Sequence, residues 1–241
     1  MGSGRVPGPL GASGSGGQAV RGVGPVGAKA QDGSPEVQIA ISFDEFKAKV
    51  LERQIRNAIK KGRQFCANVP DSELAIVEDK HRMRTKAAER CKQLLEAART
   101  ALAEAKQQGD ELAKNAGKLG VYSAYRNIPE DTAAWESSFR QYYEETRVKR
   151  AAFATGEHGR QALALMTNMM ISYKAAPGYS NHSNGLAVDF FTMHKGKKLR
   201  AKKAQKAAWS DSWLFAWLQE NAPGFEFKNL DTEEWHWDYI G

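Results

Sequence analysis

The chain has 241 residues, of which 41% are hydrophobic, 26% charged and 10% aromatic. This balance is typical of a chain that folds in water, as one sizeable core with an appendage or as two small domains, and it excludes a wholly disordered protein. The formal net charge of +7 at pH 7 suits an anionic partner such as nucleic acid or a bacterial wall polymer. The two cysteines, Cys66 and Cys91, are too few for a disulfide-built fold and match no zinc-ligand spacing.

Membrane and export signals are absent from the sequence pattern. No stretch approaches the roughly 18 consecutive apolar residues that cross a bilayer, and the N-terminal region has no apolar h-region. We therefore expect no membrane insertion and no ordinary signal peptide, which makes the protein cytoplasmic on synthesis.

The first segment, residues 1–41, is dominated by small residues. It holds 11 of the 22 glycines of the chain and almost no side chain large enough to bury. Such a segment cannot offset the entropy of ordering, so we predict a disordered Gly/Pro-rich tail.

The second segment, residues 42–118, has the pattern of helices. Ser42 and Glu45 have the Ser-x-x-Glu spacing of a capping box, which predicts a helix that begins there and ends near Gly62, and a break follows around Pro70. Apolar residues then recur in steps of three and four as far as Leu112, which predicts a long helix paired with the first in an α-helical hairpin or coiled coil. Such a segment is expected to self-associate or to dock a partner.

The charge of this segment argues against a nucleic-acid partner. It carries 17 of the basic and 12 of the acidic residues, a net charge of +5. The two signs are interleaved and no aromatic platform accompanies them, so a solvated helical face is the better interpretation.

The third segment, residues 119–241, has a different composition and contains all six tryptophans. Alternation predicts strands over 121–126, 186–191 and 235–240, and helical spacing predicts helices over 132–150, 158–171 and 209–220. Strands scattered among helices without a βαβ repeat predict an α+β domain, with a small antiparallel sheet and flanking helices.

Three residues of this segment form a candidate metal site. His182 lies in a turn rich in Gly, Ser and Asn, and Asp189 follows seven residues later in an otherwise apolar strand, where a carboxylate needs a cation or several donors. His236 lies in the C-terminal aromatic strand. Two imidazoles and one carboxylate with an open fourth position are the ligand set of a catalytic zinc ion.

Two further residues supply the other groups that hydrolysis requires. Glu233 is placed to act as the base that takes a proton from the attacking water, although the adjacent Glu234 is a second acid, and the spacing to His236 favours Glu233. Arg126, which ends Ser-Ala-Tyr-Arg, is the candidate cation for an oxyanion or a substrate carboxylate. The alternative for Arg126 is a surface ion pair.

These motifs resemble a known family. Ser-x-His-x-x-Gly-x-Ala-x-Asp over 180–189 and Glu-x-x-His over 233–236 resemble the LAS zinc metallopeptidases, and most closely the VanY-type D-alanyl-D-alanine carboxypeptidases. The resemblance covers residues 119–241 and implies an LAS/hedgehog-like zinc peptidase domain. It implies one Zn²⁺ ion, with His182, Asp189 and His236 as ligands. It also implies Glu233 as general base and acid, Arg126 as the residue that binds substrate and stabilises the transition state, and Ser180 as a residue that orients the first ligand or touches substrate.

The expected function is removal of the terminal D-alanine from peptidoglycan stem peptides. An endopeptidase that cuts within the stem peptide or cross-bridge is one alternative, and an inactive zinc domain in a coiled-coil interaction protein is another. Because peptidoglycan lies outside the cytoplasm, the expected site of action is the cell wall, the periplasm or the extracellular space, after non-classical export or lysis.

Overall fold

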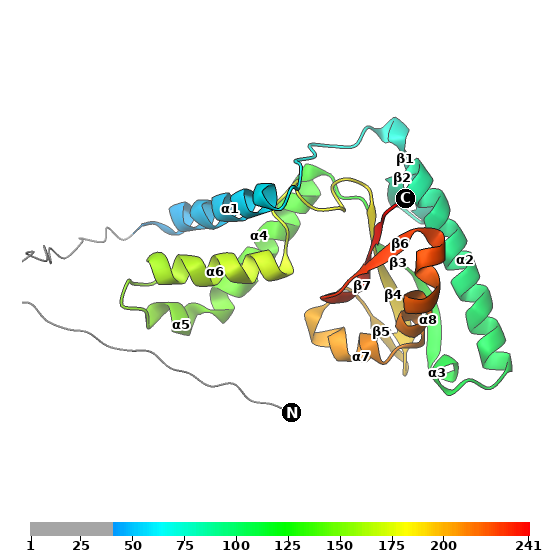
Figure 1. The fold of residues 1–241 in the computed structure, drawn as a ribbon. Helices are drawn as coiled ribbons and strands as arrows, with labels where there is room; N and C mark the ends of the chain where they lie inside the picture. Colours follow the sequence, from blue (N-terminus) through cyan, green and yellow to red (C-terminus); the bar gives the residue numbers. More distant parts are fainter. Residues whose placement is uncertain (1–40) are drawn as a thin grey trace, which may run out of the picture. The chain divides into compact units, whose positions relative to one another are not determined.

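The computed structural model describes residues 41–241 (Figure 1), so the predicted tail of residues 1–41 lies almost wholly outside the described residues. The described residues lie within one compact unit. Two hydrophobic clusters fill it, one under a central sheet and one within a separate layer of helices.

A five-stranded antiparallel sheet forms the centre of the fold. Its strands are β3 (Ala116–Ser123), β4 (Ala187–His194), β5 (Lys197–Leu199), β6 (Phe227–Leu230) and β7 (Glu233–Tyr239). The order is β3-β4-β7-β6, and β5 pairs with the far end of β4. The α+β class with a small antiparallel sheet is therefore confirmed.

Helices cover one face of this sheet. They are α2 (Thr85–Gln107), α3 (Glu111–Lys114), α7 (Lys206–Ser210) and α8 (Trp213–Asn221), with a short 3₁₀ turn at Ala222–Phe225. Their apolar side chains share one cluster with the strands, in which Trp209, Trp237 and Phe227 are fully buried. Burial of large aromatic side chains contributes a large part of the driving force for this packing.

A second set of helices forms a separate layer. It consists of α1 (Phe43–Lys60), α4 (Ile128–Glu145), α5 (Arg147–Ala151) and α6 (Arg160–Tyr173). Phe46 and Val50 of α1 pack with Trp135 and Phe139 of α4 and with Met166 of α6. The helices between β3 and β4 thus pack around α1, which precedes all strands of the sheet in the sequence.

The hairpin predicted for residues 42–118 is not the arrangement found. Residues Leu74–Glu78 and His81–Arg84 form a two-stranded hairpin, β1 and β2, which turns at Asp79 with a φ of 50°. The apolar stripe of α2 packs on β1 and on the main sheet, whereas α1 packs on α6. A stripe with helical spacing shows which face of a helix is buried but not which element covers it. No coiled coil forms within residues 41–241.

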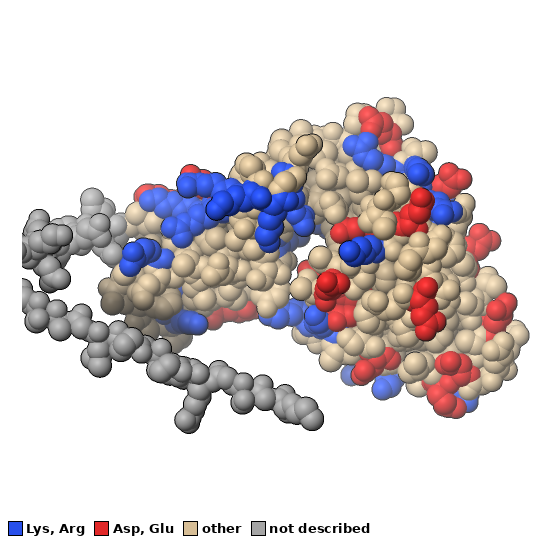
Figure 2. Space-filling model, in the orientation of Figure 1, with Lys and Arg blue, Asp and Glu red and all other residues tan. Residues whose placement is uncertain are grey.

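Basic side chains gather on one part of the surface. Figure 2 shows lysine and arginine side chains concentrated over α1 and mixed with acidic ones elsewhere on this face. The exposed basic residues in the second half of α1 and just after it are Arg53, Arg56, Lys60, Lys61 and Arg63. Among residues 41–241, no helix combines the length and the apolar character that a membrane span needs.

Candidate active site

Two neighbouring strands and one loop bring the candidate metal ligands together. Asp189 of β4 and His236 of β7 are register partners, so their side chains lie on the same face of the sheet. His182 comes from the loop between α6 and β4, which folds back over the strand that it precedes. All three side chains are buried.

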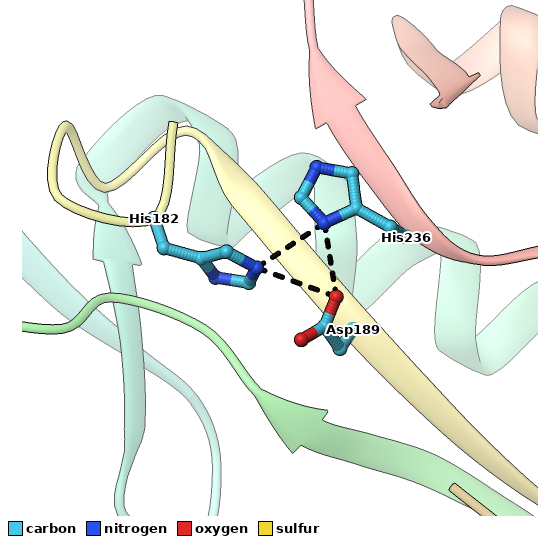
Figure 3. Close-up of side chains that lie close together, drawn as sticks. All are labelled: His182, Asp189 and His236. Atoms are coloured by element: carbon cyan, nitrogen blue, oxygen red, sulfur yellow. Dashed lines mark hydrogen bonds and ion pairs between the residues drawn. The ribbon is translucent and has the colours of Figure 1, made fainter. Parts of the chain in front are cut away.

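The three ligand atoms converge on one point (Figure 3). Asp189 Oδ1 lies 3.0 Å from His236 Nδ1 and 3.3 Å from His182 Nε2. The two imidazole nitrogens are 3.2 Å apart. One donor atom from each residue lies within 4.8 Å of the others, so the set can hold a metal ion. The sequence prediction named this same trio.

The hydrogen bond that each outer ring nitrogen makes determines which nitrogen of that histidine carries the hydrogen. His182 Nδ1 is 2.7 Å from the carbonyl oxygen of Ala124, which can only accept, so this nitrogen carries the hydrogen. His236 Nε2 is 3.0 Å from Asp238 Oδ1 and donates to it in the same way. When both rings are neutral, the inner nitrogens of His182 and His236 therefore turn two lone pairs toward each other. Because lone pairs repel, this donor set fits a cation between them.

The carboxylates around the rings add to this preference for positive charge. Burial lowers the pKa of His182. Burial acts in the same direction on His236, but hydrogen bonds with Asp189 and Asp238 outweigh it and raise the pKa of His236 to about 10. Burial opposes ionisation of Asp189, yet His182 and His236 hold the pKa of Asp189 well below its usual range. Without a metal ion this site holds a proton. A proton and a metal ion therefore compete for the same nitrogen and oxygen atoms.

Glu233 and Glu234, the two adjacent acids, have different surroundings. Glu233 Oε2 accepts a hydrogen bond from Trp235 Nε1 at 3.1 Å. Burial, followed by the charge of Asp189, raises the pKa of Glu233. Glu234 is buried instead against α7, where its Oε1 accepts from Ser210 Oγ at 3.2 Å and lies 3.5 Å from Lys206 Nζ. Only Glu233 has the surroundings of a base beside the ligands.

An irregularity in β7 brings Glu233 and His236 to the same site. In a regular strand, residues three apart point to opposite faces. Here Asn229 pairs with Trp237 and Leu230 pairs with Glu233, so one step along β6 spans four along β7. The Asn229 side-chain amide donates to the carbonyl oxygens of Glu233 at 3.1 Å and His236 at 2.9 Å, and so holds both ends of the irregular segment.

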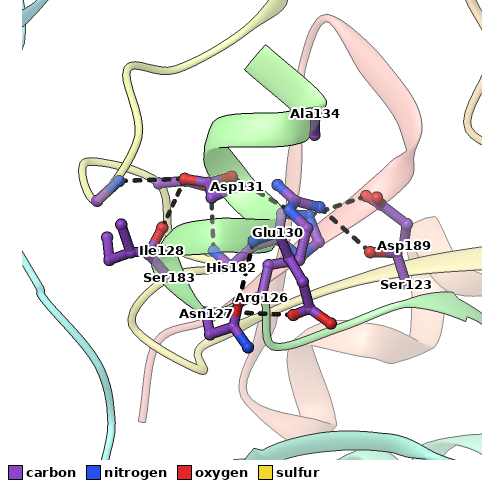
Figure 4. A network of polar contacts seen from close by, with 12 residues as sticks. Ser123, Arg126, Asn127, Ile128, Glu130, Asp131, Ala134, His182, Ser183 and Asp189 are labelled. Atoms are coloured by element: carbon purple, nitrogen blue, oxygen red, sulfur yellow. Dashed lines mark hydrogen bonds and ion pairs between the residues drawn. The ribbon is translucent and has the colours of Figure 1, made fainter. Parts of the chain in front are cut away.

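Arg126 lies beside the ligands and belongs to a buried polar network (Figure 4). Its Nε donates to Asp131 Oδ1 and its Nη1 to Ser123 Oγ, each at 3.2 Å. The Arg126 amide also donates to the carbonyl oxygen of His182 at 3.2 Å. The side chain of Arg126 is 18% exposed and that of Asp131 only 1%. Arg126 is therefore a half-buried, oriented cation rather than a surface ion pair.

Ser180 shapes the ligand loop. Its Oγ accepts the amide hydrogen of His182 at 3.1 Å, and the residue is buried. Gly185 has a φ of +69°, and a Cβ there would lie 3.2 Å from the backbone nitrogen of Arg84, which donates to the Gly185 carbonyl oxygen. The serine and glycine of the motif thus set the turn that presents His182. A contact between Ser180 and substrate stays a prediction.

Three residues near the ligands were not identified from the sequence. Asp238 holds His236, and its position two residues further along the same strand was the available signal. Asp131 and Lys174 had no such signal. Burial lowers the pKa of Lys174, as does the charge of Arg126, while Asp131, Asp189 and Glu233 raise it, which places this amine among the charges of the site.

Solved structures similar to this chain include three with 18–22% sequence identity. The D,D-pentapeptidase VanY of a VanB-type vancomycin resistance cassette, solved in complex with Zn(II), is 20% identical, with a TM-score of 0.44 over 72% of this chain and 83% of that one. The LD-carboxypeptidase LdcB is 22% identical, with a TM-score of 0.44 over 74% of each chain. DacB from Streptococcus pneumoniae is 18% identical, with a TM-score of 0.33 over 72% of this chain and 84% of that one.

The family assignment rests on the sequence of residues 80–241. No curated protein matches the chain. The family model described as VanY, D-alanyl-D-alanine carboxypeptidase, matches residues 80–241, which include all the candidate site residues. The chain therefore belongs to the VanY family of D-alanyl-D-alanine carboxypeptidases, and it is a peptidase.

Proposed function

We propose that this protein is a zinc-dependent D-alanyl-D-alanine carboxypeptidase that removes the terminal D-alanine from peptidoglycan stem peptides. The observation that carries the proposal is the convergence of two imidazole lone pairs and one carboxylate oxygen at a buried point beside Glu233 and Arg126. In this proposal His182, Asp189 and His236 hold one Zn²⁺ ion. The cell wall is the proposed site of action.

Each side chain has one part in the reaction. When bound, zinc supplies Lewis acidity, which makes water a stronger acid and the scissile carbonyl a better electrophile. The Glu233 carboxylate takes a proton from the attacking water as the new C–O bond forms. Glu233 then delivers that proton to the nitrogen of the departing D-alanine as the C–N bond breaks. Its raised pKa suits a group that both accepts and returns a proton.

Positive charge at the site suits an anionic substrate end. The Arg126 guanidinium, held by Asp131 and Ser123, presents its remaining N–H groups to the carbonyl oxygen that gains negative charge or to the substrate carboxylate. Lys174 adds a second cation near Arg126. A peptide that ends in a free carboxylate therefore fits better than an internal peptide bond, which favours the carboxypeptidase over the endopeptidase.

The decisive experiment uses the zinc-loaded full chain and pentapeptide-bearing muropeptides, with mass spectrometry of the products. The matched control is Glu233→Gln, which keeps the size of the side chain but removes the base. Loss of one alanine with the wild type alone supports the proposal. An internal cut would make the protein an endopeptidase, and no cleavage despite bound zinc would make it an inactive zinc domain.

A further inference from the structure

A short segment outside the family match runs along the active site. Residues 63–69, here called the strap, follow α1 and lie ahead of the matched residues 80–241. Most of the strap is exposed, and Phe65 keeps 58% of its surface accessible. Yet this exposed segment contacts two of the stretches of chain that carry site residues, the loop before β4 and the segment around Arg126.

The strap holds the beginning of the loop that presents His182. The Cys66 amide donates to the Gly178 carbonyl oxygen at 2.9 Å, and Arg63 Nη1 donates to that of Tyr179 at 3.0 Å. The rings of Phe65 and Tyr179 are 5.6 Å apart. Gly178 has a φ of +79°, and a Cβ there would lie 2.4 Å from the Phe65 ring. The loop and the strap are thus fitted to each other at a glycine.

The strap also holds the chain on both sides of Arg126. The Val69 amide donates to Tyr125 Oη at 3.1 Å. Asn68 Oδ1 accepts the amide hydrogen of Ile128 at 3.3 Å, and this amide is one of the unpaired donors at the start of α4. Arg126 therefore lies between two residues, Tyr125 and Ile128, that are both hydrogen-bonded to the strap.

Asp131 joins the two anchored stretches. Its Oδ2 accepts from the Gly178 amide at 3.1 Å and from Ser183 Oγ at 2.8 Å, and its Oδ1 accepts from Arg126 Nε. A continuous series of hydrogen bonds thus runs from the Cys66 amide through Gly178 and Asp131 to the Arg126 guanidinium. The Asp131 carboxylate also accepts the hydrogen bond from Ser183, the residue that follows His182.

We propose that the strap is a positioning element of the active site, which fixes the Arg126 guanidinium relative to the metal ligands. The inference rests on the proposed function, because it assigns the strap a part in that reaction. Its consequence is that the catalytic unit of this protein begins ahead of the family domain, at the end of α1. Small displacements of a catalytic group reduce the rate strongly, so exposed residues of the strap matter for turnover more than for stability.

The test uses the full zinc-loaded chain with Asn68→Ala, which removes the acceptor for the Ile128 amide. We expect kcat/KM to fall about tenfold, mainly through kcat, with unchanged zinc content and Tm. Asn68→Asp keeps an acceptor oxygen at the start of α4 and should restore activity. The matched control is Arg56→Ala, because Arg56 is exposed on α1 and, within residues 41–241, its ion pair is with Glu52; it should leave kcat/KM unchanged.

A double-mutant cycle separates positioning from a general structural effect. If the strap acts through Arg126, Asn68→Ala should cost less than about twofold in an Arg126→Ala background. An equal loss in both backgrounds, or no loss in the wild-type background, would overturn the inference.

Hydrogen exchange gives a readout that does not depend on activity. In Phe65→Ala, the amides of residues 178–183 should exchange faster than in the wild type, while those of β4 stay unchanged. If the wild type cleaves no muropeptide, the proposed function fails, and the exchange data still decide whether the strap holds the loop. Unchanged exchange in Phe65→Ala would overturn the inference.

Discussion

Asp189 and His236 are register partners in the β4–β7 ladder, and their side chains meet at 3.0 Å on the same face of the sheet. Because side chains alternate between faces, a slip of one residue in this pairing would send one of the two to the opposite face. The metal-binding geometry is therefore set by the sheet register, and His182 completes it from a loop.

Replacement of a ligand and replacement of the base should have different effects. His236→Ala removes one of three donors and should lose both bound zinc and hydrolysis. Glu233→Gln should keep about one zinc per chain and lose most activity, because the carboxylate that accepts the proton is gone. Metal analysis beside a muropeptide assay distinguishes them. Full hydrolysis by Glu233→Gln would contradict the assignment of the base.

Asp238 should tune metal affinity without touching the metal. It accepts the outer N–H of His236, so Asp238→Ala releases the ring and should weaken zinc binding by about 10- to 100-fold. Competition with a chelator measures this. Asp231→Ala, in the exposed turn before β7, is the control and should leave affinity unchanged. Equal affinity in the two variants would show that Asp238 does not orient the ligand.

The acid side of the pH–rate profile should report Glu233. Burial and then Asp189 raise the pKa of this carboxyl, and the base must be ionised to act. Activity should therefore fall as the pH drops through a pKa above the ordinary glutamate range, and be full above it. A profile of kcat/KM against pH measures the midpoint. Loss of activity only at the usual glutamate pKa would contradict the raised pKa of Glu233.

Trp235→Phe should shift the acid side of the pH–rate profile to higher pH. The Trp235 N–H donates to the Glu233 carboxylate and lowers the pKa of Glu233, so its removal should shift the limb to higher pH. Trp217→Phe on α8 serves as the matched control. A shift to lower pH, or the same shift in both variants, would refute the contact.

Asp131 should matter for stability as well as for activity. It is buried and accepts hydrogen bonds from Arg126, Gly178 and Ser183, so Asp131→Asn removes a buried negative charge from beside a cation. We expect a loss of about 2 kcal/mol in the free energy of unfolding, measured with urea. Glu136→Gln breaks a partly exposed ion pair with Lys47 and should cost about 0.5 kcal/mol or less. Equal losses would mean that Asp131 is not a structural centre of the network.

Local sequence patterns predicted the helices and strands better than they predicted which of these elements pack together. The strand expected over 235–240 is β7, and the helix expected over 209–220 is divided between α7 and α8. The expected pairing of residues 42–60 with the following helix was wrong, because both helices carry a single apolar stripe. The aromatic residues of α4 pack on the stripe of α1, and the sheet packs on the stripe of α2. Which surface covers a stripe depends on residues far away in the sequence.

The sequence by itself identified the candidate ligand set. His182, Asp189 and His236 were identified together, because a carboxylate in an apolar strand needs a cation or several donors and two histidines complete a zinc ligand set, and the structure brings the same three together. Only the tertiary structure decided how they are supported. The bonds of Asp131 to Gly178 and Ser183 span 47 and 52 residues, and those of the strap span more than 100 residues at Gly178 and Tyr179. Such contacts leave no periodic signal, because they arise only when distant segments pack against one another.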